Sequence, residues 1–284
     1  MTTTRPLPLA VLRAALRQAY SDLRPRFLGA SVLTFCLPAA VVLFVGRLAD
    51  KPGEGLGSTT AFGTMFAAGS IGAYVSMCVV QISSETYTDR IGGARLRVRI
   101  LPHGPMTWAI GKTISVVIQA VVGAVIVLVG FMLVVDSISV SPRDVVVCLV
   151  LMLLAALAST PLGFLIGALI RGAYSFTLAY LGIMALWATS GFMYPLAAMP
   201  RWLQILQLPF PAYWSGHLAR WALVGDPAWE VGGAFHPGLA VLVLVAWIVV
   251  GFALVAPIIR RSFRQETIGG LAHMRATLSS QSGM

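Results

Sequence analysis

Residues 108–135 read WAIGKTISVVIQAVVGAVIVLVGFMLVV, and Lys112 is the one charged residue in this run. A helix of about 20 apolar residues crosses the roughly 30 Å hydrocarbon core of a bilayer. The run is long enough to predict a transmembrane helix. Other apolar runs meet the same requirement, and the predicted spans are 27–45, 61–82, 108–135, 145–170, 173–193 and 239–259.

The composition excludes an ordinary soluble domain, because the 284-residue chain is 58% hydrophobic and only 11% charged. Apart from Lys112, its charged residues lie outside the apolar runs, so we expect the net charge of +10 to contact membrane lipid and not nucleic acid. The three cysteines lie in apolar runs without a CxxC pair, which excludes a zinc module or a disulfide framework. The four histidines fall in loops or the tail and are expected to be surface or interfacial residues. We therefore predict an all-α integral membrane protein.

Basic residues between the predicted spans set the orientation, since loops rich in Lys and Arg stay in the cytoplasm. Fifteen of the 20 basic residues fall on the side that holds both termini, and five fall on the other side. Eighteen of the 20 are Arg, and Ala, Val and Gly are frequent, which indicates a GC-rich bacterial genome. We expect a multi-pass protein of the bacterial cytoplasmic membrane with both termini in the cytoplasm.

The chain divides into three parts around the six predicted spans. Residues 1–26 form a predicted interfacial helix, because Leu9, Leu12, Leu16 and Tyr20 recur at helical spacing between arginines. A disordered basic leader is the alternative. Residues 27–259 form the transmembrane domain, and residues 260–284 form a cytoplasmic tail whose Ser, Gly and Thr content predicts disorder.

The loop 83–105, SSETYTDRIGGARLRVRILPHGP, is longer and more charged than a turn between two spans requires. Its acidic start and basic end suit a helix dipole, but Gly92 and Gly93 argue against one unbroken helix. The alternating RLRVR also permits a short extended segment, and a simple solvated loop is a further alternative.

The segment 190–220, SGFMYPLAAMPRWLQILQLPFPAYWSGHLAR, follows the fifth predicted span on the outer face. Its prolines predict short helices, one beginning near Pro200 and a second after Pro211. An aromatic belt at the outer interface would account for its aromatic residues, and we prefer that interpretation for Trp214 and Trp221.

Both segments resemble signatures of the ABC-2 type transporter permease family, among which this chain looks most like the daunorubicin and multidrug-resistance exporters. The first motif is carried by Asp89, Arg90, Gly93, Pro102, Trp108, Gly111 and Lys112. It departs from the family pattern at Ile91, where an acidic residue is common, and at Ala94, where Thr is common. The second motif is carried by Ser190, Gly191, Pro195, Pro200, Trp202, Leu203, Pro211, Tyr213 and Arg220.

The resemblance implies six transmembrane helices, with a cytoplasmic coupling helix between spans 2 and 3 and short outer helices between spans 5 and 6. The implied ATPase-coupling loop comprises Asp89, Arg90, Gly93, Arg95, Arg97, Arg99 and Pro102. The implied outer gate comprises Gly191, Tyr194, Pro195, Pro200, Trp202, Pro211 and Tyr213.

Energy must come from a partner, because the sequence has no GxxxxGK[ST] phosphate loop. The chain is expected to be no enzyme by itself and to bind no cofactor or metal. The resemblance implies two copies of an ABC ATPase, which would hold ATP and Mg, and a second permease subunit that is identical or paralogous.

The residues do not identify a single class of cargo. The predicted spans lack ionisable residues apart from Lys112, which favours a hydrophobic or amphipathic compound such as a drug. Export of a lipid or lipid-linked glycan is one alternative, and a non-transporting assembly or immunity protein on the same scaffold is another. The motif Gly163-x-x-x-Gly167 could serve packing within the subunit or dimerisation.

Overall fold

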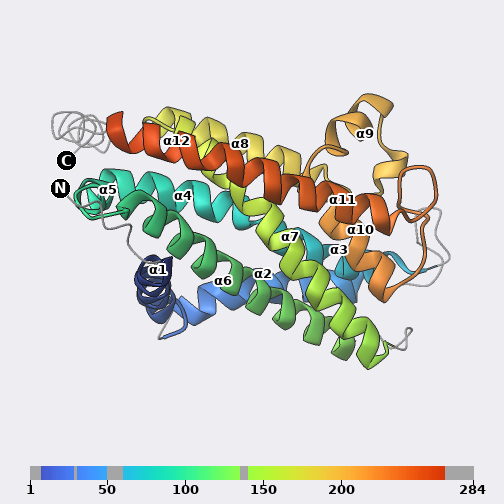
Figure 1. Ribbon diagram of the computed structural model, residues 1–284. Coiled ribbons are helices and arrows are strands. Elements are labelled where there is room, and N and C mark those ends of the chain that lie inside the picture. Colours follow the sequence, from blue (N-terminus) through green and yellow to red (C-terminus); the bar gives the residue numbers. More distant parts are fainter. Residues whose placement is uncertain (1–7, 29–30, 50–59, 135–139, 266–284) are drawn as a thin grey trace, which may run out of the picture.

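The computed structural model describes residues 8–28, 31–49, 60–134 and 140–265, and the regular elements in these ranges are all helical. Long helices run side by side along one direction, and shorter ones lie at both ends (Figure 1). The prediction of an all-α protein is confirmed. Residues 1–7 and 266–284, which include most of the predicted tail, lie outside the described ranges.

The long helices include α2 (Ser31–Leu48), α6 (Gly104–Val134), α7 (Pro142–Leu169) and α8 (Ala173–Ala188). Two further rods are composite. In the first, α3 (Phe62–Ser76) continues into α4 (Cys78–Ile91); in the second, α11 (Pro237–Ala246) continues through the π-helical turn η3 (Trp247–Gly251) into α12 (Phe252–Gln265). The second rod extends past residue 259 into the segment that we assigned to the tail.

Within the described residues, four helices are long and apolar enough to cross a membrane: Phe62–Ile91, Gly104–Leu133, Pro142–Leu169 and Pro237–Arg264. The predicted fifth span corresponds to α8, a shorter apolar helix that ends at Ala188 instead of residue 193. The count of six spans therefore stays a prediction.

The two ends of the bundle carry different elements (Figure 1). One end, called the α5 end below, holds α1 (Pro8–Leu23), the short turn η1 (Arg24–Arg26) and α5 (Ala94–Arg99). The opposite end, called the α9 end, holds η2 (Leu196–Ala198), α9 (Arg201–Gln207) and α10 (Pro211–Leu223).

Helix α1 lies across the bundle at the α5 end, beside α6 (Figure 1). Ala15 and Ala19 are buried, while the apolar side chains Leu9, Leu12 and Tyr20 are 45–68% exposed. A helix with one face packed on the protein and apolar side chains left exposed suits the membrane interface. The alternative of a disordered leader is wrong for Pro8–Leu23.

The sequence explains where α7 begins and what it packs against. Ser141 and Asp144 form a capping box at its start, in which each side chain accepts a hydrogen bond from the other residue's backbone N–H. Further along, Gly163 and Gly167 contact α4, since an added Cβ would lie 2.8 Å from Ile82 and 2.9 Å from Thr86, respectively. The small-residue motif is therefore used for packing within the subunit.

Helices α3 and α10 approach each other still more closely. A Cβ added at Gly72 would lie only 2.2 Å from the backbone oxygen of Ser215, so the two backbones are in contact at this point. Only glycine permits that approach.

Replacing Gly72 by alanine should therefore push α3 and α10 apart and destabilise the protein by about 1–3 kcal/mol, as overpacking does elsewhere. Thermal unfolding in detergent measures the effect. Gly182→Ala in α8 is the matched control, because no atom lies within 4 Å of a Cβ added there. Equal melting temperatures for the two variants would contradict this account of the α3–α10 contact.

Candidate functional site

The predicted coupling segment is a helix, a sharp turn and a second helix. The first part of the predicted loop 83–105 is helical, because α4 continues the α3 rod as far as Ile91. Gly93 then takes a left-handed conformation with φ of 73°, which glycine adopts without strain, and α5 begins at the next residue. The predicted break at Gly92–Gly93 is confirmed, whereas the alternative of an extended segment is wrong because Ala94–Arg99 is helical.

Arg95 fixes α5 to the rest of the bundle. Its side chain is only 1% exposed, and its guanidinium carbon lies 4.3 Å from the ring centroid of Phe263 and 5.5 Å from that of Trp108. Its Nη2 also donates to Oγ of Ser262 at 2.9 Å. These are cation–π and hydrogen-bond contacts within the chain. Arg95 therefore holds α5 against α6 and α12 and is not exposed to a docking partner.

Asp89 and Arg90, at the end of α4, also make contacts within the chain. Asp89 accepts a hydrogen bond from the indole N–H of Trp108 at 2.8 Å. Arg90 donates to the carbonyl oxygen of Ile170 and, at 3.0 Å, to Oγ of Ser262. Together with Arg95, these two residues tie the turn between α4 and α5 to α6, α7 and α12.

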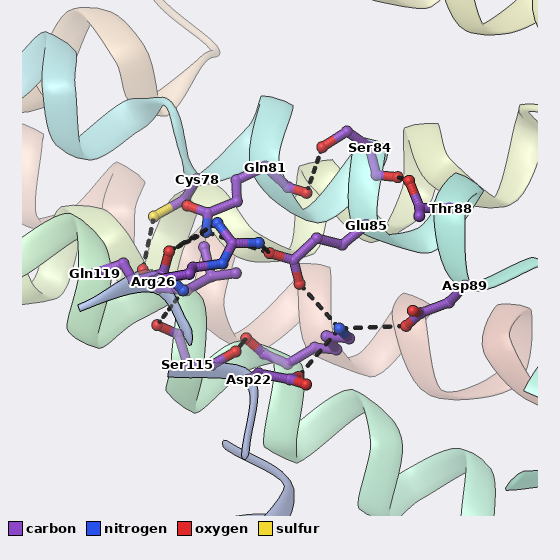
Figure 2. Close-up of polar contacts among 12 residues, drawn as sticks. Asp22, Arg26, Cys78, Gln81, Ser84, Glu85, Thr88, Asp89, Ser115 and Gln119 are labelled. Carbon is purple, nitrogen blue, oxygen red and sulfur yellow. Dashed lines mark hydrogen bonds and ion pairs between the residues drawn. The ribbon is translucent and has the colours of Figure 1, made fainter. Parts of the chain in front are cut away.

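A charged network lies beside this turn and joins α1, η1, α4 and α6 (Figure 2). The ammonium group of Lys112 in α6 lies 3.1 Å from Asp22 of α1, 3.1 Å from Glu85 of α4 and 3.3 Å from Asp89. Arg26 of η1 pairs with Glu85 and donates to Gln119 of α6 at 2.8 Å. Because three carboxylates face two cations, each ion has an opposite charge within reach.

This network corrects one expectation from the sequence. The second predicted span ended at residue 82 and left Glu85 and Asp89 in a loop, but both lie on the Phe62–Ile91 helix and face Lys112. Glu85 lies four residues before Asp89, and Gln119 lies seven residues after Lys112. Neither is a motif residue, so only the spatial convergence of α4 and α6 shows their connection.

The other residues of the predicted coupling loop face outward. Arg97, Arg99 and Pro102 are exposed at the α5 end. They adjoin two exposed apolar side chains, Ile100 at 84% and Leu101 at 57%. The result is a small surface of mixed basic and apolar character, called the α5 face below, on a segment that Arg90 and Arg95 hold in place.

A second cluster, buried at the α9 end, is centred on Glu230. Its Oε1 accepts from Nε of Arg220 at 2.6 Å, and its Oε2 accepts from the hydroxyl of Tyr213 at 3.0 Å. Nδ1 of His217 lies 2.7 Å from the same Oε2. All four side chains are 0–1% exposed, and Arg220 also donates to the carbonyl oxygen of Gly191 at 3.2 Å.

The hydrogen bonds define the charges in this cluster. Nε2 of His217 accepts from the backbone N–H of His236 at 3.0 Å, so the ring carries its proton on Nδ1 and donates it to Glu230. Burial by itself would raise the pKa of Glu230, but the opposite charge of Arg220 and the bond from His217 outweigh burial and lower this pKa to about 2. Glu230 is thus a carboxylate, and the buried cluster is a neutral ion pair with polar partners.

Of the residues predicted for an outer gate, the structure brings only two into this cluster, Tyr213 and Gly191. Gly191 has a φ of 88°, which suits its place in the turn after α8. Pro195 and Pro211 are buried at the starts of η2 and α10, whereas Tyr194, Pro200 and Trp202 are exposed. The short helices predicted after Pro200 and Pro211 are α9 and α10.

Two expectations at this end are wrong. His217 is fully buried and is not a surface residue, because its ring is bound on both nitrogens. Trp214 is 3% exposed and donates to the carbonyl oxygen of Leu208 at 2.6 Å, so it does not belong to an aromatic belt. Trp221, at 39% exposure, remains compatible with one. Glu230 was not predicted, because its loop carries no motif.

No group of three or more His, Cys, Asp or Glu side chains within the described ranges could hold a metal ion. Within each of the two charged clusters the ions pair with one another. The arrangement suits the mechanical connection of helices.

Comparison with known proteins agrees with the two motifs. The sequence model of a family described as ABC-2 family transporter protein matches residues 57–256. That range contains both the α4–α5 turn and the Glu230 cluster. No curated protein matches the chain.

Proposed function

Since the chain belongs to the ABC-2 family of transporter proteins, we propose that it is the membrane-spanning subunit of an ATP-binding cassette exporter. The proposed cargo is a hydrophobic or amphipathic compound such as a drug. Separate ATPase subunits supply the energy, because the chain has no phosphate loop of its own.

The α5 face is the observation that carries this proposal. Exposed Ile100 and Leu101 beside Arg97 offer apolar contact area with basic groups next to it, which suits a protein groove better than solvent. The face is held rigidly, since Arg95 is buried against Phe263 and Arg90 is bonded to Ile170. A force on α5 would therefore reach α6, α7 and α12.

The proposed assembly places the α5 end in the cytoplasm, with both termini, and the α9 end outside the cell. Two copies of the ATPase would each contact one α5 face, on this permease and on a second, identical or paralogous one. The excess of basic residues on the α5 side favours this orientation in a bacterial cytoplasmic membrane.

In the proposed mechanism, ATP-driven closure of the ATPase subunits pushes on α5. The continuous Phe62–Ile91 helix and its contacts with α7 at Gly163 and Gly167 pass the motion toward the α9 end as a rigid body. The Glu230 cluster keeps α10 and the following loop together during this motion.

Purification of the tagged protein from native membranes in mild detergent tests the proposal, with mass spectrometry of the proteins that accompany it. We expect a stoichiometric protein with a phosphate-loop ATPase sequence, and the presence or absence of a second permease establishes the dimer type. Stimulation of its ATPase activity by a drug supports the exporter of drugs, whereas stimulation by a lipid or lipid-linked glycan alone overturns that cargo. Recovery of the chain without an ATPase in several detergents overturns the transporter and favours an assembly or immunity role.

A further inference from the structure

A cavity of about 530 Å³ is lined by residues of η1, α2, α3, α4, α6 and α8. Its volume falls in the range of about 300–1,000 Å³ that is typical of small-molecule sites. Its residues come from helices far apart in the sequence, and most of its lining is apolar.

The apolar wall is formed by Tyr74, Met77, Trp187 and Phe192. The ring centroids of Trp187 and Phe192 are 4.0 Å apart, and the indole N–H of Trp187 donates to the carbonyl oxygen of Ala73 at 2.9 Å. Because its polar atom is already satisfied and its ring is packed, Trp187 presents a fixed apolar surface.

The other end of the cavity is polar and is formed by Arg26, Gln81 and Gln119. Gln81 donates to Gln119 at 2.7 Å, and Arg26 donates one N–H from each terminal nitrogen, to Gln119 and to Glu85. Each of these nitrogens carries a second N–H.

Charge at this end is asymmetric. Five charged side chains form the network of Figure 2, but Arg26 is the one among them that lines the cavity. The carboxylates of Asp22, Glu85 and Asp89 all face Lys112 instead. Because Lys112 also pairs with Asp22 and Asp89, Arg26 keeps its pair with Glu85 and would bind a further anion through its remaining N–H groups.

We propose that this cavity binds an amphiphile with one anionic head group. The head group accepts hydrogen bonds from Arg26, and the apolar body lies against Tyr74, Trp187 and Phe192. The inference rests on the proposed function, since it names the cargo class of the exporter. It disfavours cationic compounds, because a cation would meet the guanidinium of Arg26 first.

Photolabelling of the purified full-length chain in phosphatidylcholine nanodiscs, without any ATPase, tests the site. The probes are a long-chain fatty acid bearing a diazirine and the alkylamine and alcohol of the same length. We expect the acid to label peptides of α3, α4 and α8 about tenfold more than the amine, as a charge-assisted hydrogen bond would produce.

Variants of the polar end separate charge from folding. Arg26→Gln should remove the preference for the acid, Arg26→Lys should retain it, and Arg17→Gln, a change at an exposed arginine of α1, should leave it unaltered. Val80→Trp, which fills the cavity, should lower labelling by all three probes. Gel filtration confirms that each variant is folded.

Equal or stronger labelling by the amine, or an unchanged preference in folded Arg26→Gln, would overturn the proposal. Addition of phosphatidylglycerol identifies the source of the anion: suppression of labelling assigns the site to an anionic membrane lipid, and unchanged labelling assigns it to a free amphiphile. Because the assay contains no ATPase, its failure leaves the permease assignment standing. Conversely, a purification that recovers no ATPase would overturn the transporter without contradicting the binding site in the cavity.

Discussion

Replacing Glu230 by glutamine should destabilise the protein by about 3–5 kcal/mol, the cost of leaving a buried charge without its partner. Arg220 and Glu230 are both 0% exposed, and Nε of Arg220 lies 2.6 Å from Oε1 of Glu230. Glutamine keeps the size and removes the charge, so Arg220 loses its counter-ion. We expect a much lower melting temperature in detergent and a large loss of monodisperse protein.

The matched controls are Asp226→Asn and the double variant Glu230→Gln with Arg220→Met. Asp226 belongs to the same loop but is only half-buried, so its change should cost much less. The double variant removes both charges and should cost less than the sum of the two single changes. Additive costs would show that Arg220 and Glu230 do not act as a pair.

Replacing Ile100 by glutamate should reduce association with the ATPase about tenfold or more while the permease stays folded. Ile100 is the most exposed apolar residue of the α5 face, at 84%, so its side chain contributes nothing to the core. At the centre of a docking surface, a carboxylate would be desolvated without a partner. The amount of ATPase recovered with the tagged permease measures the effect.

Arg97→Glu should act in the same direction, and Arg17→Glu on α1 is its control, since both arginines are exposed and only Arg97 belongs to the α5 face. Arg95 cannot serve this test, because its replacement would disturb the packing on Phe263 and Trp108. Unchanged recovery of the ATPase with Ile100→Glu and Arg97→Glu would contradict docking at α5.

Periodicity and length predicted the helical class and the positions of most long helices, because apolar runs and their flanking charges are local features. The start of α7 follows from Ser141 and Asp144 in the same way. The extension of α4 to Ile91 was not predicted, because charged residues such as Glu85 are typical of a loop between two spans. They lie on a helix because Lys112 and Arg26, distant in sequence, neutralise them.

The same distinction between local features and contacts distant in sequence applies to the candidate sites. The sequence correctly predicted the helix break at Gly92–Gly93, which follows from local backbone conformation. It could not show that Arg95 turns inward, since the rings that hold it come from α6 and α12. Likewise, the hydrogen bond between Glu230 and His217 could not be predicted, because it forms only where α10 packs against the loop before α11.

ATP-driven transport by the purified complex tests the central claim most directly. Proteoliposomes would contain either the permease with its co-purified ATPase or the permease alone, and a fluorescent amphiphile would be followed across the membrane. The account predicts ATP-dependent movement by the complex, lost with the Ile100→Glu permease and absent from the permease alone. Movement without the ATPase, or none with the complex and ATP for any amphiphile tested, would contradict it.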